Sequence, residues 1–156
     1  MGYTERTKDD PLEMGRADDQ NESVDNDIYF YSRICYLAIE IVDKDTLLTT
    51  GDGKRGFHIP PEVGGMDLVY VHAHCMTPSA VGIPTFQLRN VTDGVDMMTT
   101  LLTVDATESD SSTAAAPAVI DTAHDDVAAN DWLEWDCDVA GDTTKGVILT
   151  VGFRMP

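Results

Sequence analysis

Basic residues are scarce in this chain. Lys and Arg total 10 against 28 Asp and Glu, which gives a formal net charge of -18 over 156 residues. Nucleic acids and anionic membranes are bound through clusters of Lys and Arg, and a negative field of this size repels both. We therefore expect no direct nucleic-acid partner and no membrane partner, whereas protein partners and cations remain possible.

Long apolar runs and paired cysteines are also missing. No segment reaches the ~20 apolar residues that span a bilayer, and no apolar stretch of signal-peptide length follows the first charges. We therefore expect the chain to fold in a cytoplasm. The three cysteines, Cys35, Cys75 and Cys137, lie far apart inside apolar runs. This pattern predicts reduced core thiols rather than disulfides or a catalytic nucleophile.

Catalytic motifs are absent too, because neither a G-x-S-x-G elbow nor a Gly-rich phosphate loop occurs. His72 and His74 are two apart, so on a strand they would share a face and could reach one metal ion. Metal-binding jelly rolls of the cupin type also need a Glu shortly afterwards and a further His on a later strand. No Glu follows closely and no His follows His124. We expect no enzyme activity, no cofactor and no metal site.

Acidic residues form several clusters that could supply oxygen ligands to Ca²⁺. None follows the twelve-residue EF-hand pattern, and solvation together with protection of an edge strand is the simpler interpretation. Calcium binding stays open at this point. The clusters are Asp93 and Asp96; Asp121, Asp125 and Asp126; and Asp131 through Asp138.

Composition divides the chain into an arm and a body. Residues 1–33 are predicted to form an acidic, flexible N-terminal arm, since the stretch up to residue 27 is almost empty of large aliphatic side chains. Near the end of the arm, Ile28, Tyr29, Phe30 and Tyr31 form an apolar cluster. We interpret it either as a cap on the core edge or as a protein interface, because clustered aromatics suit both.

Residues 34–156 read as one mostly β domain. The run ICYLAIEIV at 34–42 is apolar at nearly every position, as in a strand covered on both faces, although a short buried helix fits as well. The cluster at 51–54 predicts a tight turn. Alternation in 66–76 puts Leu68, Tyr70, His72 and His74 on one face. Further strands are expected at 57–59, 85–91, 98–104, 118–120, 132–139 and 147–153. Many short strands without a long helix predict an all-β, jelly-roll-like sandwich with an extended N-terminal arm.

Three phrases between residues 49 and 154 carry a family resemblance: TTGDGKRGFHIPPEVGGMDLVYVHA, then LRNVTDGVDMMTTLLTVDATESDSSTAAAPAVIDTAHDDVAANDWLEWDCDV, then KGVILTVGFR. They resemble jelly-roll proteins encoded in tailed-phage structural gene clusters. Members of this group look like head decoration (cement) proteins, head fibres or tail-fibre modules that act as trimers. The resemblance carries no catalytic residues.

The resemblance implies a non-enzymatic virion protein, made in the host cytoplasm and placed on the capsid surface. Its expected partners are the major capsid protein and further copies of itself in a homotrimer. The leading hypothesis is a capsid decoration or cement protein that binds the outer shell and bridges major capsid subunits to stabilise the head. The alternative is a head- or tail-fibre module that binds host-surface glycan, with an exposed aromatic such as Trp132 as the sugar platform.

Overall fold

The computed structural model describes residues 33–156, of which residues 34–156 form one unit. The predicted arm and the cluster Ile28 to Tyr31 lie outside the described residues. The elements are β1 (Cys35–Leu47), β2 (Gly51–His58), β3 (Met66–Thr77), β4 (Thr85–Asn90), β5 (Val95–Asp96), β6 (Met98–Thr100), β7 (Leu102–Thr103), the 3-10 helix η1 (Ser111–Thr113), β8 (Val119–Ile120), β9 (Asp126–Val127), β10 (Trp132–Val139) and β11 (Lys145–Arg154).

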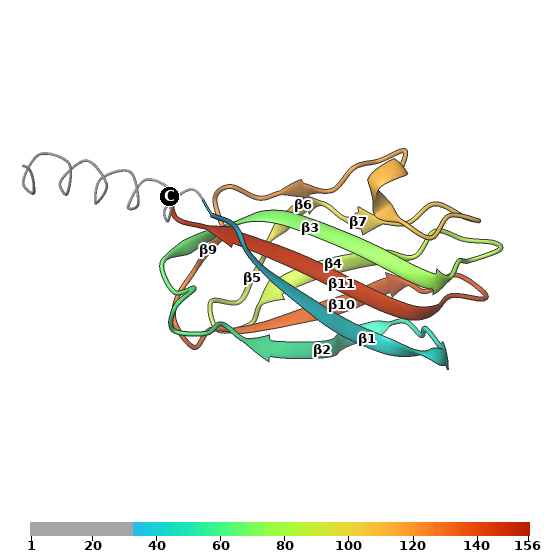
Figure 1. Ribbon diagram of the computed structural model, residues 1–156, viewed down its shortest axis with the longest axis horizontal. Coiled ribbons are helices and arrows are strands. Elements are labelled where there is room, and N and C mark those ends of the chain that lie inside the picture. Colours follow the sequence, from blue (N-terminus) through green and yellow to red (C-terminus); the bar gives the residue numbers. More distant parts are fainter. Residues whose placement is uncertain (1–32) are drawn as a thin grey trace, which may run out of the picture. The chain divides into compact units, whose positions relative to one another are not determined.

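These strands form two main sheets, which Figure 1 shows one behind the other. The front sheet has the order β1-β11-β3-β9. The back sheet has the order β2-β10-β4-β5, with β7 also on β4, and a small third sheet pairs β6 with β8. Every pairing is antiparallel. From β1 to β4, and again from β9 to β11, successive strands alternate between the sheets, which is the wrapping of a jelly roll. The predicted all-β jelly-roll sandwich is thereby confirmed.

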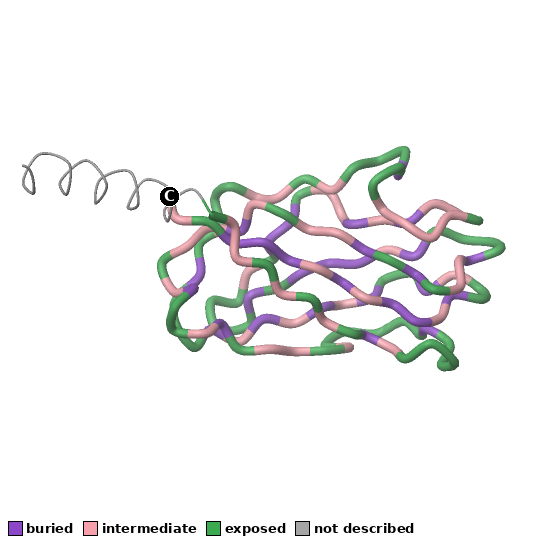
Figure 2. The backbone as a smooth tube through the Cα atoms, viewed as in Figure 1, coloured by how far each residue is buried: buried purple, intermediate pink, exposed green. Residues whose placement is uncertain are grey.

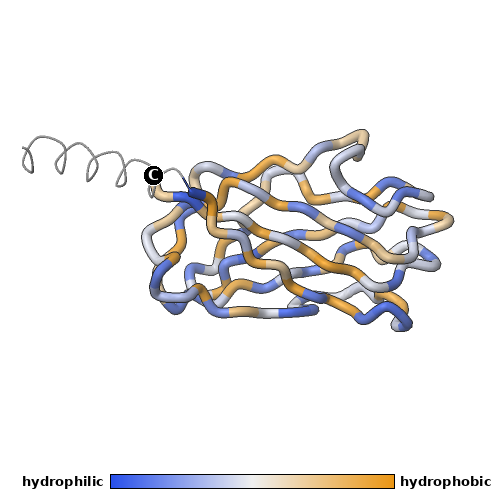
Figure 3. The backbone as a smooth tube through the Cα atoms, viewed as in Figure 1, coloured by the Kyte–Doolittle hydropathy of each residue, from blue (hydrophilic) through white to orange (hydrophobic). Residues whose placement is uncertain are grey.

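Apolar side chains from the two sheets meet between them and form the core. Buried segments run along the middle of the strands, and hydrophobic stretches follow the same course (Figures 2 and 3). The period of two in β10 and β11 explains this, since it turns alternate side chains inward. The largest fully buried side chains are Trp135, Phe86, Phe153, Ile59, Leu68, Leu88, Met97, Leu133, Leu149, Val104, Val147 and Val151.

Strand β3 departs from simple alternation near its start. The expectation that Leu68 shares a face with Tyr70 is wrong, because Leu68 is buried in the core. Leu68 pairs with Phe153 and Tyr70 pairs with Gly152, so β3 advances two residues while β11 advances one. Val69 is the extra residue of this β-bulge, and a bulge reverses the facing of the residues that precede it. From Tyr70 onward the predicted alternation holds.

The turn predicted at 51–54 is also wrong, because these residues belong to β2. Cys137 pairs with Gly51 and Trp135 with Arg55, so β2 carries extra residues in this interval. Gly53 has a φ of 59°, a conformation that glycine adopts without penalty. A glycine-rich bulge therefore gives the same sequence signal as a turn. The single strand expected at 98–104 is likewise divided into β6 and β7.

Strand β1 is not covered on both faces within the described structure. It lies at the edge of the front sheet and pairs with β11 alone. Tyr36, Ala38 and Glu40 point outward and are exposed, whereas Leu37 and Ile39 pack partly against the core. The expectation of two covered faces therefore fails for the outer one.

Candidate functional site

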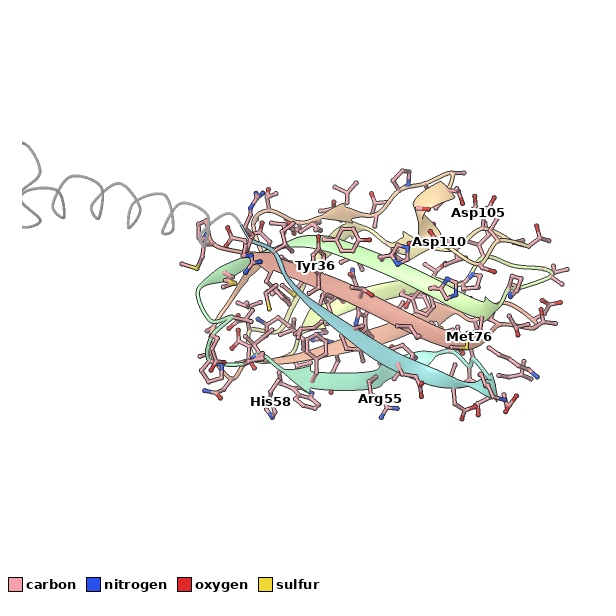
Figure 4. All side chains as sticks on the ribbon, viewed as in Figure 1. Tyr36, Arg55, His58, Met76, Asp105 and Asp110 are labelled. Atoms are coloured by element: carbon pink, nitrogen blue, oxygen red, sulfur yellow. The ribbon has the colours of Figure 1, made fainter. Side chains whose placement is uncertain are left out.

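The outer face of the front sheet is the candidate interaction surface, and Figure 4 looks onto it. Its side chains come from three neighbouring strands that pair in register, so residues far apart in the chain become neighbours. Glu40 is the only carboxylate among the ten residues named next, although the chain carries a net charge of -18, and Asp67 lies opposite Arg154 further along the same outer side. We call this surface the front face: Tyr36, Ala38 and Glu40 of β1; Ile148, Thr150 and Gly152 of β11; and Tyr70, His72, His74 and Met76 of β3.

The outer face of the back sheet has the opposite character. Along β10 its outward positions are Trp132, Glu134, Asp136 and Asp138, and Arg89 lies opposite Glu134 on β4. Burial raises the pKa of the Asp136 carboxyl, and the carboxylates of Asp52 and Glu134 add to this rise. Carboxylates therefore follow β10 of the back sheet, whereas the front face carries Glu40 alone and has Asp67 and Arg154 beyond one end.

Two tyrosines form the centre of the front face. Tyr36 and Tyr70 meet edge to face over Gly152, with ring centroids 5.4 Å apart and planes at 88°. A Cβ atom at Gly152 would lie 2.9 Å from Cε1 of Tyr36 and 3.0 Å from Cβ of Tyr70, so glycine makes room for this pair. The ring of His72 lies parallel to that of Tyr70, with centroids 6.1 Å apart. Tyr36 nevertheless remains 53% exposed. The two rings thus hold each other in place while Tyr36 stays about half exposed and Tyr70 somewhat less.

A histidine and aspartate cluster borders this aromatic pair. Asp110 Oδ2 lies 3.0 Å from His72 Nε2 and 3.9 Å from His74 Nδ1, which is beyond hydrogen-bond range. Asp110 also caps η1, because its Oδ1 accepts the backbone N–H of Ser112 at 2.7 Å. Hydrogen bonds from Ser112, aided by His72, lower the pKa of Asp110 to about 2. The cluster ties the segment before η1 to β3.

These groups do not assemble a metal centre. Within residues 33–156, no three His, Cys, Asp or Glu side chains are arranged to hold a metal ion. Two carboxylates of the acidic clusters instead support loops. Buried Asp131 accepts hydrogen bonds from Asn90 Nδ2 at 3.0 Å and from the Ala128 N–H at 2.8 Å. Asp121 accepts from His124 Nδ1 at 2.8 Å. Hydrogen bonding within the chain accounts for these carboxylates.

Trp132, the sugar platform considered from sequence, lies on the back sheet and is partly covered. Its ring covers Gly56, where a Cβ atom would come within 2.1 Å of Trp132 Cζ2. The ring of His58 packs against it with centroids 4.6 Å apart. Its indole N–H donates to Glu134 Oε1 at 2.6 Å. Both its ring and its polar atom are therefore engaged within the chain.

The three cysteines are free thiols. Cys75 and Cys137 lie in the core, where burial raises the pKa of each thiol to about 11. Cys35 is partly buried near the start of β1. The core thiols are thus protonated at neutral pH and have no nucleophilic character.

A pocket of about 320 Å³ opens beside the front face, between β3 and the segment from η1 to β8. Tyr70 and His72 line one side of it, and Ile120 lines the other. Sequence reasoning did not find this pocket, because its walls are separated by many residues in the chain. The aromatic pair was also missed, although the nearly continuous apolar run at residues 34–42 was a usable signal for it.

Comparisons with protein-family models, with curated proteins and with solved structures give no match to this chain. In the part of the chain that the structure describes, no helix has the length and apolar character needed to cross a membrane. The candidate surface must therefore be interpreted from its own chemistry.

Proposed function

We propose that this chain is a non-enzymatic structural protein of a tailed-phage virion, a capsid decoration or cement protein that binds the outer shell and bridges major capsid subunits. The observation that carries the proposal is the front face, an ordered and nearly uncharged surface on an otherwise acidic jelly roll. The three phage-like phrases between residues 49 and 154 supply the virion context.

The distribution of charge supports binding through the front face. Interface centres are depleted of charged residues and enriched in aromatic residues, whereas their rims are polar. Tyr36, Tyr70 and Met76 have this character, and the three are 53%, 38% and 52% exposed. The acidic surface elsewhere keeps an unbound subunit soluble. A partner with a matching apolar surface would bury these side chains without stripping water from a charge cluster.

Partners and location follow from the resemblance and form part of the proposal. The shell of major capsid protein is the binding surface, and a homotrimer of this chain would add its weak contacts by avidity. The expected location is the virion surface, after synthesis in the host cytoplasm. The fibre-type alternative relied on an exposed tryptophan, and the internal contacts of Trp132 with Gly56 and Glu134 give it less support.

Co-sedimentation with expanded capsids that carry no decoration tests the proposal. The wild-type chain should bind saturably, and Ala38→Lys should bind at least ~10-fold more weakly, because a buried unpaired ammonium costs more than ~1.4 kcal/mol. Ala128→Lys is the matched control, since Ala128 is exposed and lies outside the front face. A variant lacking residues 1–27 tests the predicted arm.

Two results would contradict this function. If the wild-type chain fails to sediment with capsids, the decoration role is lost. If Ala38→Lys and Ala128→Lys bind equally well, the front face is not the contact surface. Circular dichroism and thermal unfolding of each variant establish that the body is folded before binding is compared.

A further inference from the structure

The pocket beside the front face coincides with a gap in the sheet. Strand β9 pairs with β3 only at Met66 and Asp67. Further along, the Ala73 N–H donates to Ser111 Oγ at 2.9 Å, and the Cys75 N–H donates to the Ser109 carbonyl at 2.8 Å. Between these two regions no described strand lies beside β3 on this side. The pocket fills that interval.

The gap leaves backbone groups of β3 available to a ligand. In an antiparallel strand, alternate residues turn their N–H and C=O groups to the same edge. Because Ala73 turns its N–H toward the gap, Val71 presents its own N–H and C=O groups there. The bulge residue Val69 and its neighbour Tyr70 also line the pocket. A ligand with hydroxyl groups could therefore bond to the strand edge as a neighbouring strand would.

Side chains give the pocket one apolar and one polar wall. Leu102, Pro117 and Ile120 supply the apolar part, and Ser111 and Ser112 supply hydroxyl groups, of which that of Ser112 also interacts with the Asp110 carboxylate. The Ser111 hydroxyl oxygen accepts the Ala73 N–H, so its own proton is free to be donated. This mixture matches a ligand that has both C–H faces and hydroxyl groups.

His72 joins the pocket to the Asp110 carboxylate. Asp110 is an acceptor at neutral pH, so His72 Nε2, the atom 3.0 Å from the carboxylate, carries a proton and donates it to Asp110. The ring of Tyr70 lies parallel to His72 and forms the side of the pocket that joins the front face.

The charge of the groups around the pocket limits which small ligands could bind in it. The residues that line the pocket include no Lys and no Arg, and the carboxylate of Asp110 lies beside it. Anionic ligands such as phosphates, carboxylates and sialic acids would therefore be repelled. A volume of about 320 Å³ lies at the small end of ligand pockets, which span roughly 300–1,000 Å³.

We propose that this pocket binds one uncharged sugar residue, with a C–H face of the pyranose against Tyr70 and its hydroxyl groups on Ser111, Ser112 and the open edge of β3. This property goes beyond the proposed shell-binding function and does not depend on it. The site is also distinct from Trp132, which lies on the back sheet.

Backbone amide NMR of the full chain, titrated with neutral monosaccharides, tests the proposal. The probes are glucose, galactose, mannose and N-acetylglucosamine, with N-acetylneuraminic acid as the anionic comparison. At least one neutral sugar should give saturable shifts at residues 69–73 and 111–120, with an affinity in the roughly millimolar range that suits a single small site. The anionic sugar should give none.

Two variants and one control make the test specific. Ala118→Phe fills the pocket and Tyr70→Ala removes the ring, and each should weaken binding at least ~10-fold. Trp132→Ala, which removes the aromatic side chain of the back sheet, should leave the affinity unchanged. The proposal is overturned if no neutral sugar gives saturable shifts, if the shifts map elsewhere, or if both pocket variants bind like the wild type. Capsids are absent from these titrations, so failure here is separable from failure of shell binding.

Discussion

Replacing Asp110 with Ala should lower the free energy of unfolding by about 1–2 kcal/mol at pH 7. Asp110 caps η1 through the Ser112 N–H at 2.7 Å, and loss of such a cap costs ~0.5–2 kcal/mol. Its contact with His72 is partly exposed and adds only ~0–1 kcal/mol. The lower end is expected if the Ser112 N–H finds water in the variant.

Part of this loss should disappear in acid. The pKa of Asp110 is lowered in the fold from its ordinary value of 3.8 to about 2. At ~1.36 kcal/mol for each pH unit the difference sets an upper limit of roughly 2.4 kcal/mol. Because the side chain is 39% exposed, screening reduces this to about 1 kcal/mol. A depressed folded-state pKa stabilises the fold above pH 3.8, and this stabilisation is lost as the pH falls from 3.8 to 2.

Urea unfolding, followed by tryptophan fluorescence from pH 7 down to 2.5, measures both effects. Asp110→Asn should lose the pH-dependent part and keep much of the cap, since Asn is also a good N-cap residue. Asp138→Ala is the control for a change of net charge at an exposed position. The reasoning is refuted if the Asp110→Ala loss is the same at pH 7 and pH 2.5, or if it stays below ~0.3 kcal/mol throughout.

Two further predictions concern the core. The buried indole N–H of Trp135 has no hydrogen-bond partner among the described residues, a state that costs ~1–3 kcal/mol. Trp135→Phe removes that donor and should change the free energy of unfolding, measured in urea, by less than ~1 kcal/mol. Trp135→Ala should lower it by ~3–5 kcal/mol. A loss above ~2 kcal/mol for Trp135→Phe would contradict the absence of a hydrogen bond to the N–H. Cys75 and Cys137 should resist a thiol reagent at pH 8 until urea unfolds the chain, because burial raises the pKa of each to about 11. Labelling of Cys75 or Cys137 in the native chain would contradict this.

The strands of the fold centre could be predicted because their period of two survives along most of their length, failing in β10 only at Val139, which is exposed beyond a register shift. In β10, Leu133, Trp135 and Cys137 face inward, and in β11 the same holds for Leu149 and Val151. These residues bury a complete inner face, so the local pattern and the tertiary environment agree. The short strand at β8 was predicted correctly as well, between flanking loops.

Positions that depend on backbone irregularity could not be read from the pattern. Val69 is an ordinary strand residue in sequence, and only its pairing with β11 shows that it forms a bulge. Gly53 serves a bulge with the same positive φ that a turn would require. Contacts over long separations were equally hidden, since Asp110 reaches His72 across 38 residues. The sequence indicated which residue types could form the candidate site, but not which residues lie next to each other in space.

Strand β1 was expected to be covered on both faces, but its outer face is exposed. This difference is the strongest reason to expect assembly with a partner. A strand at the edge of a sandwich normally presents polar or charged residues outward, since an exposed apolar edge invites pairing with other chains. Here Tyr36 and Ala38 face outward, and Glu40 supplies the single charge between residues 34 and 42. The run has the composition of a strand covered on both faces, yet the body covers one. A partner surface on the front face would supply the missing cover, and the acidic back sheet would direct that partner to this side alone.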